Sequence, residues 1–354
     1  MAAFDIKKLL QSVVTHGASD LHLVSRTEPQ IRLDGILKPV NLPEMTGDDI
    51  EEMCYSLITE KQKKQFEEHY ELDFALLLPN IGRFRANYYK TLGETAAAFR
   101  IIPIDVPSLD DLSAPPIYKS LVKREKGLIL VTGPTGSGKS TTLAAMLNEI
   151  NLNEQKHIVT VEDPVEFIHQ NKKCVFSHRG VGEDTSSFAT ALKYAMRQDP
   201  DIILIGEMRD KETIEAGLTA AETGHLVFAT LHTSSAAGTI NRIIDVFSGD
   251  EQPQIRAMIS SSLVAVIAQA LLPKLGGGRV AASEILITNH AISNLIREDK
   301  VHQIYSQMQL GQGDSGMQTQ TQALVKFIQE GKISRDIALQ YANKPDEVSK
   351  AAIR

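Results

Sequence analysis

The chain has 354 residues, of which 42% are hydrophobic, and a formal net charge of −7. Its length predicts roughly two domains with a substantial core. The acidic balance argues against a general nucleic-acid-binding protein, which usually carries net positive charge. The two cysteines, Cys54 and Cys174, form no C-x-x-C pair, so they indicate neither a disulfide framework nor a zinc site.

No signal peptide is expected, because the N-terminus lacks a basic segment followed by an apolar one. The most apolar long run, Leu263–Leu272, is too short to span a bilayer, which needs about 20 residues. We predict a core helix there. A cytoplasmic protein that does not span the membrane fits these features, although it could dock on a membrane assembly.

The first hundred residues predict a compact α+β domain over 1–102. An amphipathic helix is expected over 4–17 and closed by Gly17, and Thr59 is the expected N-cap of a later helix. The other elements expected here are strands over 18–24, 30–35, 72–78, 82–89 and 95–102, and helices over 47–58 and 60–69.

Four prolines separated by acidic residues mark 103–116, so we expect an inter-domain linker at 103–118. Strands and helices then alternate over 119–287, which predicts a mostly parallel sheet with helices on both faces. Its expected strands are 127–132, 158–162, 201–206 and 225–231. The remainder, 288–354, is predicted to be helical, with a flexible turn at 310–316 and helices over 291–298, 301–309, 319–330 and 334–342.

The stretch Gly133–Ser140 fits the pattern G-x-x-x-x-G-K-[ST], between an apolar strand and a run of helix formers. Such a loop wraps phosphates with backbone N–H groups, assisted by the helix N-terminus. Lys139 is expected to reach the β- and γ-phosphates, and the Ser140 hydroxyl to ligate Mg²⁺. The alternative, an accidental glycine-rich turn, is disfavoured by this context. The residues expected to bind ATP here are Gly133, Pro134, Thr135, Gly136, Ser137, Gly138, Lys139, Ser140 and Thr141.

Two acidic sites follow predicted strands. The strand over 201–206 ends in Glu207, as in a Walker B element, and Glu207 is expected to hold Mg²⁺ through water. Another strand runs into Glu162, Asp163 and Glu166, one of which is a candidate to polarise the attacking water. Spacing alone does not choose between Glu162 and Glu166. The alternatives are a surface acid and a solvated acidic loop.

A histidine stands at each end of the predicted strand over 225–231. His232, at the carboxyl end, could sense the γ-phosphate or touch a neighbouring subunit, whereas a structural role is as common for such a residue. Arg83 and Arg85 share a strand face and Arg100 lies on the next strand, so they could close over a polyphosphate. Ordinary surface arginines are the alternative.

Together these motifs resemble the secretion-ATPase superfamily of type II secretion and type IV pili, over nearly the whole chain. The segments that carry the resemblance are Gly133–Ser140, Glu162–Phe167, Ile205–Asp210, Ala221–Thr233, Gly17–Leu23 and Gly276–Ala282. Within it, Ala291–Glu298 resembles the retraction motif Ala-Ile-Arg-Asn-Leu-Ile-Arg-Glu, with Ser293 in place of the arginine. Two cysteines cannot form the tetracysteine zinc insert of the assembly ATPases.

The resemblance implies a RecA-like P-loop ATPase domain with a smaller PAS-like α+β N-terminal domain, in a homo-hexamer that binds ATP and Mg²⁺ near domain and subunit boundaries. It implies Glu166 as the catalytic glutamate and Glu207 as the Walker B acid. The further residues that it assigns to the nucleotide site are Arg83, Arg85, Arg100, Glu162, His225 and His232.

The implied function is a motor for pilus retraction in twitching motility, docked at the cytoplasmic face of the inner membrane. Its implied partners are the inner-membrane pilus platform protein and a paralogous retraction ATPase. An accessory retraction ATPase or a pilus-assembly or secretion ATPase is the nearest alternative. A slow ATP-binding regulator or scaffold and a DNA-translocating motor belong to other classes; the complete set of acids and arginines argues against the first, and the acidic balance against the second.

Overall fold

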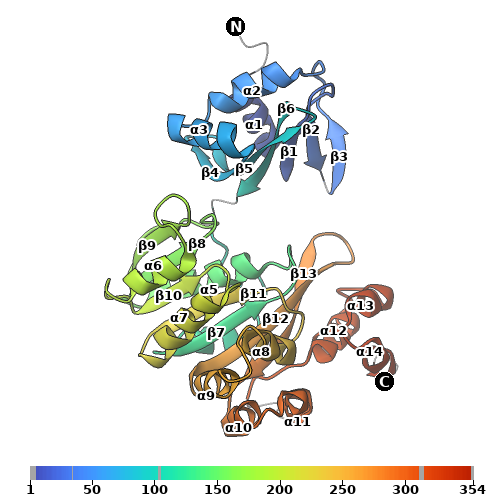
Figure 1. Ribbon diagram of the computed structural model, residues 1–354. Coiled ribbons are helices and arrows are strands. Elements are labelled where there is room, and N and C mark those ends of the chain that lie inside the picture. Colours follow the sequence, from blue (N-terminus) through green and yellow to red (C-terminus); the bar gives the residue numbers. More distant parts are fainter. Residues whose placement is uncertain (1–4, 34, 103–104, 311–314, 352–354) are drawn as a thin grey trace. The chain divides into compact units, whose positions relative to one another are not determined.

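The computed structural model describes residues 5–33, 35–102, 105–310 and 315–351 (Figure 1). The chain divides into two compact units, Met1–Asp105 and Val106–Arg354. The first is built on an antiparallel sheet and the second on a mostly parallel one, so the predicted α/β fold class with a smaller α+β N-terminal domain is confirmed.

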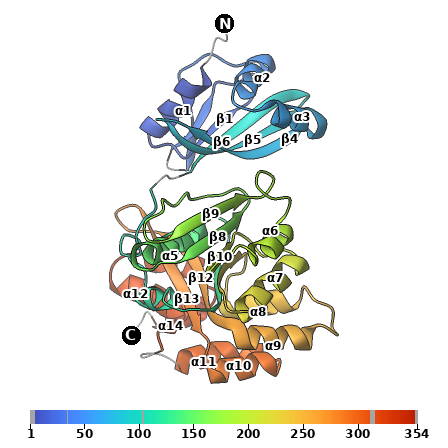
Figure 2. The same ribbon diagram turned by 90° about the vertical axis from the view of Figure 1, so that its left-hand side faces the viewer.

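The first unit is a six-stranded sheet in the order β3-β2-β1-β6-β5-β4, with helices packed on one face (Figure 2). Thr59 caps its helix in a capping box, as predicted, and Gly17 adopts the positive φ of 67° expected after a helix end. The elements are α1 (Ile6–Thr15), β1 (Asp20–Leu23), β2 (Gln30–Leu33), β3 (Ile36–Pro39), α2 (Gly47–Tyr55), α3 (Glu60–His69), β4 (Glu71–Leu78), β5 (Gly82–Thr91) and β6 (Glu94–Ile102).

The second unit contains a seven-stranded sheet in the order β13-β12-β7-β11-β10-β8-β9, parallel except for the β12–β13 pair. Its strands are β7 (Gly127–Thr132), β8 (His157–Glu162), β9 (Val175–Gly180), β10 (Ile202–Ile205), β11 (Leu226–Leu231), β12 (Leu263–Pro273) and β13 (Arg279–Ile287). The expected strands at β7, β8, β10 and β11 are therefore confirmed to within two residues.

Helices cover both faces of this sheet. One face packs against α4 and α5 and the other against α6 to α11, and each face has its own buried cluster. The helices that precede β12 are α4 (Ile117–Leu121), α5 (Lys139–Asn153), α6 (Phe188–Ala195), α7 (Lys211–Glu222), α8 (Ala236–Ile244) and α9 (Gln252–Ser262).

The run Leu263–Leu272 is a strand, so the predicted core helix is wrong. β12 pairs with β7 on one side and with β13 on the other, and both of its faces are covered. Such a strand is apolar almost without interruption, and periodicity then cannot distinguish it from a buried helix. The adjacent β13 and the edge strand β9 were not predicted either.

The C-terminal portion is helical, as predicted, and its last helices pack beside β12 and β13 (Figure 1). Its elements are α10 (His290–Arg297), η1 (Val301–Gln303), α11 (Ile304–Leu310), α12 (Gln320–Gln329), α13 (Arg335–Tyr341) and α14 (Pro345–Ala351). α14 was not predicted. Most of the expected turn at 310–316 lies outside the described residues.

Part of the expected linker belongs to the second unit. Leu109 and Tyr118 are both 2% exposed in the cluster beneath β7 and β12. The Tyr118 hydroxyl donates to Ser283 Oγ at 3.0 Å. The segment after Val106 is therefore anchored, although 103–104 lie outside the described residues and the boundaries 103 and 118 stay predictions.

Candidate active site

Parallel pairing brings the predicted site residues of the second unit to one edge of its sheet. β7, β11, β10 and β8 are consecutive neighbours, and Thr132 at the end of β7 is in register with Leu231 at the end of β11. Gly133–Ser140 therefore leaves the sheet beside His232, followed by Glu207 and then Glu162. This carboxyl edge is where open α/β sheets bind ligands.

The loop Gly133–Ser140 has the backbone that a phosphate cradle needs. Gly136 and Gly138 have φ of 79° and 87°, values that favour glycine, and α5 begins directly after them. Lys139 lies over the loop, where its Nζ donates to the carbonyls of Gly133 at 3.0 Å and Pro134 at 3.1 Å. Burial lowers the pKa of Lys139, which the charges of Glu207 and Glu166 oppose.

Two observations test the fit of this loop to phosphate. The Ser137 hydroxyl is buried and has no hydrogen-bond partner within the described ranges. At the same time the loop ends at the N-terminus of the 15-residue helix α5, which attracts anions. An oxyanion would satisfy both features, so the residues present fit a polyphosphate.

Gln269 on β12 supports the loop, and sequence reasoning missed it. Its Nε2 donates to the Ser137 carbonyl at 2.6 Å, and its Oε1 accepts from Thr142 Oγ1 at 3.0 Å. A Cβ at Gly133 would lie 2.2 Å from the Gln269 carbonyl oxygen, so only glycine fits there. The one available signal was a polar residue inside an otherwise apolar run.

Glu207 follows β10, and one oxygen of its carboxylate contacts both Arg209 and His232. Arg209 Nε lies 2.6 Å and His232 Nε2 lies 3.2 Å from Glu207 Oε1. Burial alone would raise the pKa of Glu207, but the hydrogen bond from Arg209 and the charge of His232 lower it overall. Glu207 is therefore held as a carboxylate, in contact with His232. Sequence reasoning did not single out Arg209.

The acidic box places its two glutamates differently. Glu162 ends β8 and is 8% exposed, and its Oε2 accepts the Glu166 backbone N–H at 3.1 Å. Glu166 is half-buried and close enough to Lys139 for its charge to raise the pKa of that lysine. Glu162 thus positions the backbone of the box, while the charge of Glu166 acts on the phosphate loop's lysine.

A cation at this edge would need ligands beyond the protein. Across the described residues, no cluster of three or more His, Cys, Asp or Glu side chains could hold a metal ion by itself. Ser140 and Gly206, the residue before Glu207, nevertheless line the same small cavity at this edge. Mg²⁺ usually combines one or two protein oxygens with water and substrate phosphates, so Ser140 and Glu207 fit it.

His225 lies at the other end of β11 from the phosphate loop. Its Nδ1 contacts the Ala220 carbonyl at 3.0 Å, and the rise of a strand puts it roughly 20 Å from the end of β11. The second unit therefore does not bring His225 together with Gly133–Ser140. Its expected nucleotide contact stays a prediction.

The three arginines share one face of the first unit's sheet. Arg85 and Arg100 are directly opposite across β5 and β6, and Arg83 is two residues from Arg85 on the same strand. Asp73 binds Arg85 through both carboxylate oxygens, and Asp20 accepts from Arg100 Nε at 2.7 Å. The predicted shared face is confirmed, whereas a nucleotide contact stays a prediction.

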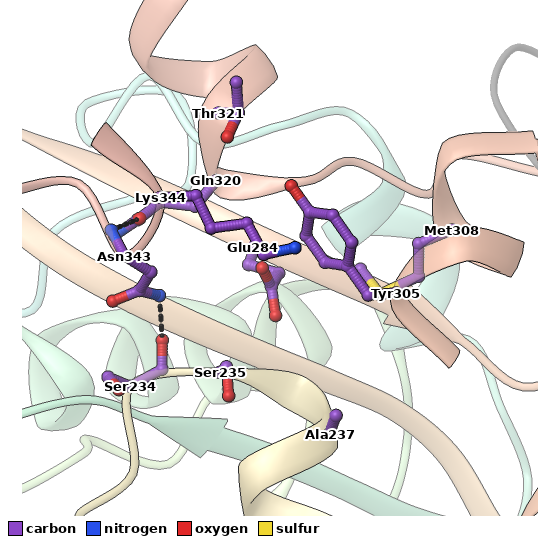
Figure 3. Close-up of a pocket in the computed structure, with 10 residues that line it drawn as sticks. All are labelled: Ser234, Ser235, Ala237, Glu284, Tyr305, Met308, Gln320, Thr321, Asn343 and Lys344. Atoms are coloured by element: carbon purple, nitrogen blue, oxygen red, sulfur yellow. Dashed lines mark hydrogen bonds between the residues drawn. The ribbon is translucent and has the colours of Figure 1, made fainter. Parts of the chain in front are cut away.

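A cavity of about 290 Å³ lies between the loop after β11 and the C-terminal helices (Figure 3). At its floor Glu284 on β13, 3% exposed, accepts from the Ala236 N–H at 2.8 Å and from the Gln320 N–H. Asn343 donates to the Ser234 carbonyl at 2.8 Å across the same cavity. The segment that follows His232 is thus bonded to the C-terminal portion.

Known proteins match this chain over most of its length. The family model for Type II/IV secretion system proteins matches residues 2–277. The type IV pilus retraction ATPase PilT of Pseudomonas aeruginosa is 50% identical over 97% of this chain and 99% of that protein. The type IV pilus ATPase PilU of the same organism is 37% identical over 97% of this chain and 90% of that protein.

A solved structure agrees with the whole fold. The crystal structure of the pilus retraction motor PilT with bound ADP has a TM-score of 0.91 and 46% identity, over 98% of this chain and 99% of that one. No helix in the described part of the chain is long and apolar enough to cross a membrane. The chain belongs to the Type II/IV secretion system protein family, in the branch of retraction ATPases that includes PilT.

Proposed function

We propose that this chain is a homo-hexameric motor that hydrolyses ATP to retract type IV pili. The observation that carries the proposal is the set of neighbouring strand ends, where the phosphate loop, His232, Glu207 and Glu162 follow one another along one sheet edge. The 50% identity to PilT over 97% of the chain gives this site its biological context.

ATP binds to Gly133–Ser140 in this proposal. Lys139 exchanges its carbonyl partners for phosphate oxygens, which offer it a full negative charge in place of two dipoles. The backbone N–H groups of the loop and the start of α5 hold the remaining phosphate charge. The ADP bound to the PilT crystal structure supports this assignment.

Ser140 and, through water, Glu207 would hold Mg²⁺, which would supply positive charge to the β- and γ-phosphates. Glu207 remains ionised because Arg209 and His232 face its carboxylate. In this proposal His232 senses the γ-phosphate, and its contact with Glu207 couples the metal site to the bound nucleotide. The deeper Glu162 keeps the acidic box in place.

Glu166 orients the attacking water and accepts its proton. Its position near Lys139, rather than in the buried place of Glu162, favours it as the base. Arg83, Arg85 and Arg100 stabilise the charge that develops on the transferred phosphoryl group. Asp73 and Asp20, the present acidic partners of Arg85 and Arg100, would hold these two side chains ready on a rigid sheet.

The motor works at the cytoplasmic face of the inner membrane, on the pilus platform protein and together with a paralogous retraction ATPase. We place the domains at 1–102, 119–287 and 288–354, with 103–118 between the first two, and we place His225 at a contact with the nucleotide of a neighbouring subunit. The division of the chain between Asp105 and Val106 supports the first boundary.

Steady-state ATP hydrolysis by the purified full chain tests the enzymatic part. We expect turnover that Glu207→Ala abolishes, and a Glu207→Ala variant with full activity would overturn the site. Turnover unchanged by added DNA is expected as well. Deletion of the gene should leave pili assembled but unable to retract, and loss of pili altogether would overturn the direction of force.

A further inference from the structure

A second, smaller cavity lies directly behind the phosphate loop. It measures about 30 Å³ and lies between α5, the acidic box and the ends of β10 and β11. Its polar lining is Ser140, Glu162, His169, Gly206 and Thr230, and the rest is apolar. The cavity is therefore lined by parts of the proposed catalytic centre: the metal ligand Ser140, the acidic box and the ends of two strands.

His169, which lines this cavity, carries an unsatisfied polar atom. The residue is 7% exposed, and its Nδ1 is buried without a hydrogen-bond partner in the described part of the chain. Burial lowers the pKa of His169 to about 4, so the imidazole is neutral. Native proteins rarely leave such an atom unpaired, because its desolvation is then uncompensated.

The imidazole is also fixed in place. Its ring is stacked on Phe176 with the centroids 4.5 Å apart and the planes within 3°. The His169 backbone N–H donates to His178 Nε2 at 3.2 Å, and His178 Nδ1 is 3.0 Å from Thr160 Oγ1. The Phe176 ring and the His178 ring, whose centroid lies 6.0 Å from that of His169, restrict rotation of the imidazole, so its Nδ1 cannot easily turn towards another protein group.

We propose that His169 holds an ordered water in this cavity and, through it, positions Ser140 and Glu162 for the metal ion and the acidic box. A cavity of about 30 Å³ has room for a water molecule, which needs polar partners on two to four sides. The Ser140 hydroxyl, the Glu162 carboxylate and the Thr230 hydroxyl are such partners. His169 is thus a positioning residue, in an inference that rests on the proposed ATPase site.

The water would connect residues with different tasks. Ser140 is the proposed protein ligand of Mg²⁺, and Glu162 holds the backbone of Glu166. Groups behind the direct metal ligands commonly change metal affinity by about 10- to 100-fold when they are removed. The same water would thus tie the metal affinity of the loop to the geometry of the catalytic glutamate.

Two near-isosteric substitutions separate this role from packing. An asparagine amide reaches the position of Nδ1, two bonds from Cβ, whereas a glutamine amide reaches that of Nε2. Both lose the imidazole stack on Phe176, so we expect similar losses of melting temperature. We therefore compare His169→Asn with His169→Gln in the full chain.

The first measurement is the Mg²⁺ concentration for half-maximal binding of a fluorescent ADP analogue, which does not depend on turnover or on pili. We expect His169→Asn to remain within about twofold of the wild type and His169→Gln to need about tenfold more Mg²⁺. Binding of the analogue without Mg²⁺ should be the same in all three proteins. Equal behaviour of both variants in the Mg²⁺ titration would overturn the proposal.

A crystal structure of the wild-type chain supplies the second readout. It should show a water within hydrogen-bonding distance of His169 Nδ1, and a dry cavity would overturn the inference even if ATPase activity is normal. Conversely, a wild-type chain without turnover would contradict the proposed function, while the water and the Mg²⁺ titration would still decide the role of His169.

Discussion

Gln269 and Ser137 join the antiparallel edge of the sheet to the phosphate loop through a 2.6 Å hydrogen bond, from Gln269 Nε2 to the Ser137 carbonyl. Gln269 is 3% exposed and Ser137 is 2% exposed. Water therefore cannot readily replace this bond, and the loop's backbone is set by a strand outside the motif.

Replacing Gln269 by Glu tests this support. The variant keeps the acceptor for Thr142 but loses the donor to Ser137, and it adds negative charge beside a phosphate site. We expect ATP affinity to fall at least about tenfold, from the loss of one buried hydrogen bond and the added repulsion. Equilibrium binding of a fluorescent ATP analogue measures it.

Thr142→Val is the matched control, since it removes only the contact from Thr142 Oγ1 to Gln269 Oε1. Its ATP affinity should change by less than about threefold. Wild-type affinity in Gln269→Glu would show that the bond to Ser137 does not shape the loop.

The acidic box allows a second comparison, between Glu166 and its exposed neighbour Asp163. Glu166→Gln removes the proposed base without changing the shape of the side chain, so kcat should fall at least about 100-fold. ATP binding should remain within a few-fold of the wild type. Asp163→Asn changes the box's charge equally but should retain most activity. Equal loss in both variants would assign the effect to charge alone.

Asp20 gives the first unit a predictable response to acid. Burial raises its pKa, but hydrogen bonds from Ser19 and Arg100 outweigh this and lower it overall. A depressed native pKa stabilises the fold above the unfolded value, about 3.9, and that stability is lost as the pH falls through the native pKa. The protection factors of the β1 and β6 amides in the full chain, which correct for the slower intrinsic exchange in acid, should therefore fall below about pH 4.

In Asp20→Asn this acid dependence should be weaker. At neutral pH the opening free energy of the same amides should be lower by about 1–2 kcal/mol, so that they exchange faster. Asp49→Asn, at an exposed capping box of the same unit, is the control and should leave β1 and β6 unchanged. An unaltered acid response in Asp20→Asn would contradict the assignment.

Glu284 is expected to be the most sensitive position of the C-terminal cavity. Its carboxylate accepts from the N-terminal turns of α8 and α12, whose dipoles favour a negative charge there. Glu284→Ala leaves both N–H groups without this acceptor, so the free energy of unfolding should fall by about 2–4 kcal/mol. Chemical denaturation measures this change.

Glu284→Gln keeps one carbonyl oxygen and should lose less than half as much stability. Burial raises the pKa of Glu284, so the ionised form costs stability that rises as the pH climbs from the unfolded value through the native one. The glutamine variant does not ionise at this position, so its stability should lack this pH dependence. If the Glu284→Ala chain were as stable as the wild type, the two hydrogen bonds by which Glu284 joins α8 and α12 would not stabilise the fold, which would contradict this account.

The chemistry of this chain was easier to predict than the framework behind it. Gly133–Ser140, Glu162 and Glu207 follow short apolar strands, and the ends of parallel strands meet by topology, so pattern alone predicted their meeting. The strand β12 was misassigned because an apolar run buried on both faces carries no period. The role of Gln269 was missed for the same reason, because it depends on the pairing of β12 with β7.

Other contacts depend on distances that no pattern contains. His169 and His178 meet because β9 pairs with β8, and β9 was not predicted. Arg209 was visible in Ile205–Asp210, but only its 2.6 Å contact with Glu207 shows which acid it faces. His225 and His232 look alike in sequence, whereas the strand separates them by its whole length.

Imaging of labelled pili in cells that carry Glu166→Gln in place of the wild-type chain tests the central claim most directly. We predict that these cells assemble surface pili that extend but do not retract, while cells with Asp163→Asn retract them at close to the wild-type speed. Normal retraction in Glu166→Gln cells would contradict an ATP-driven motor with this active site.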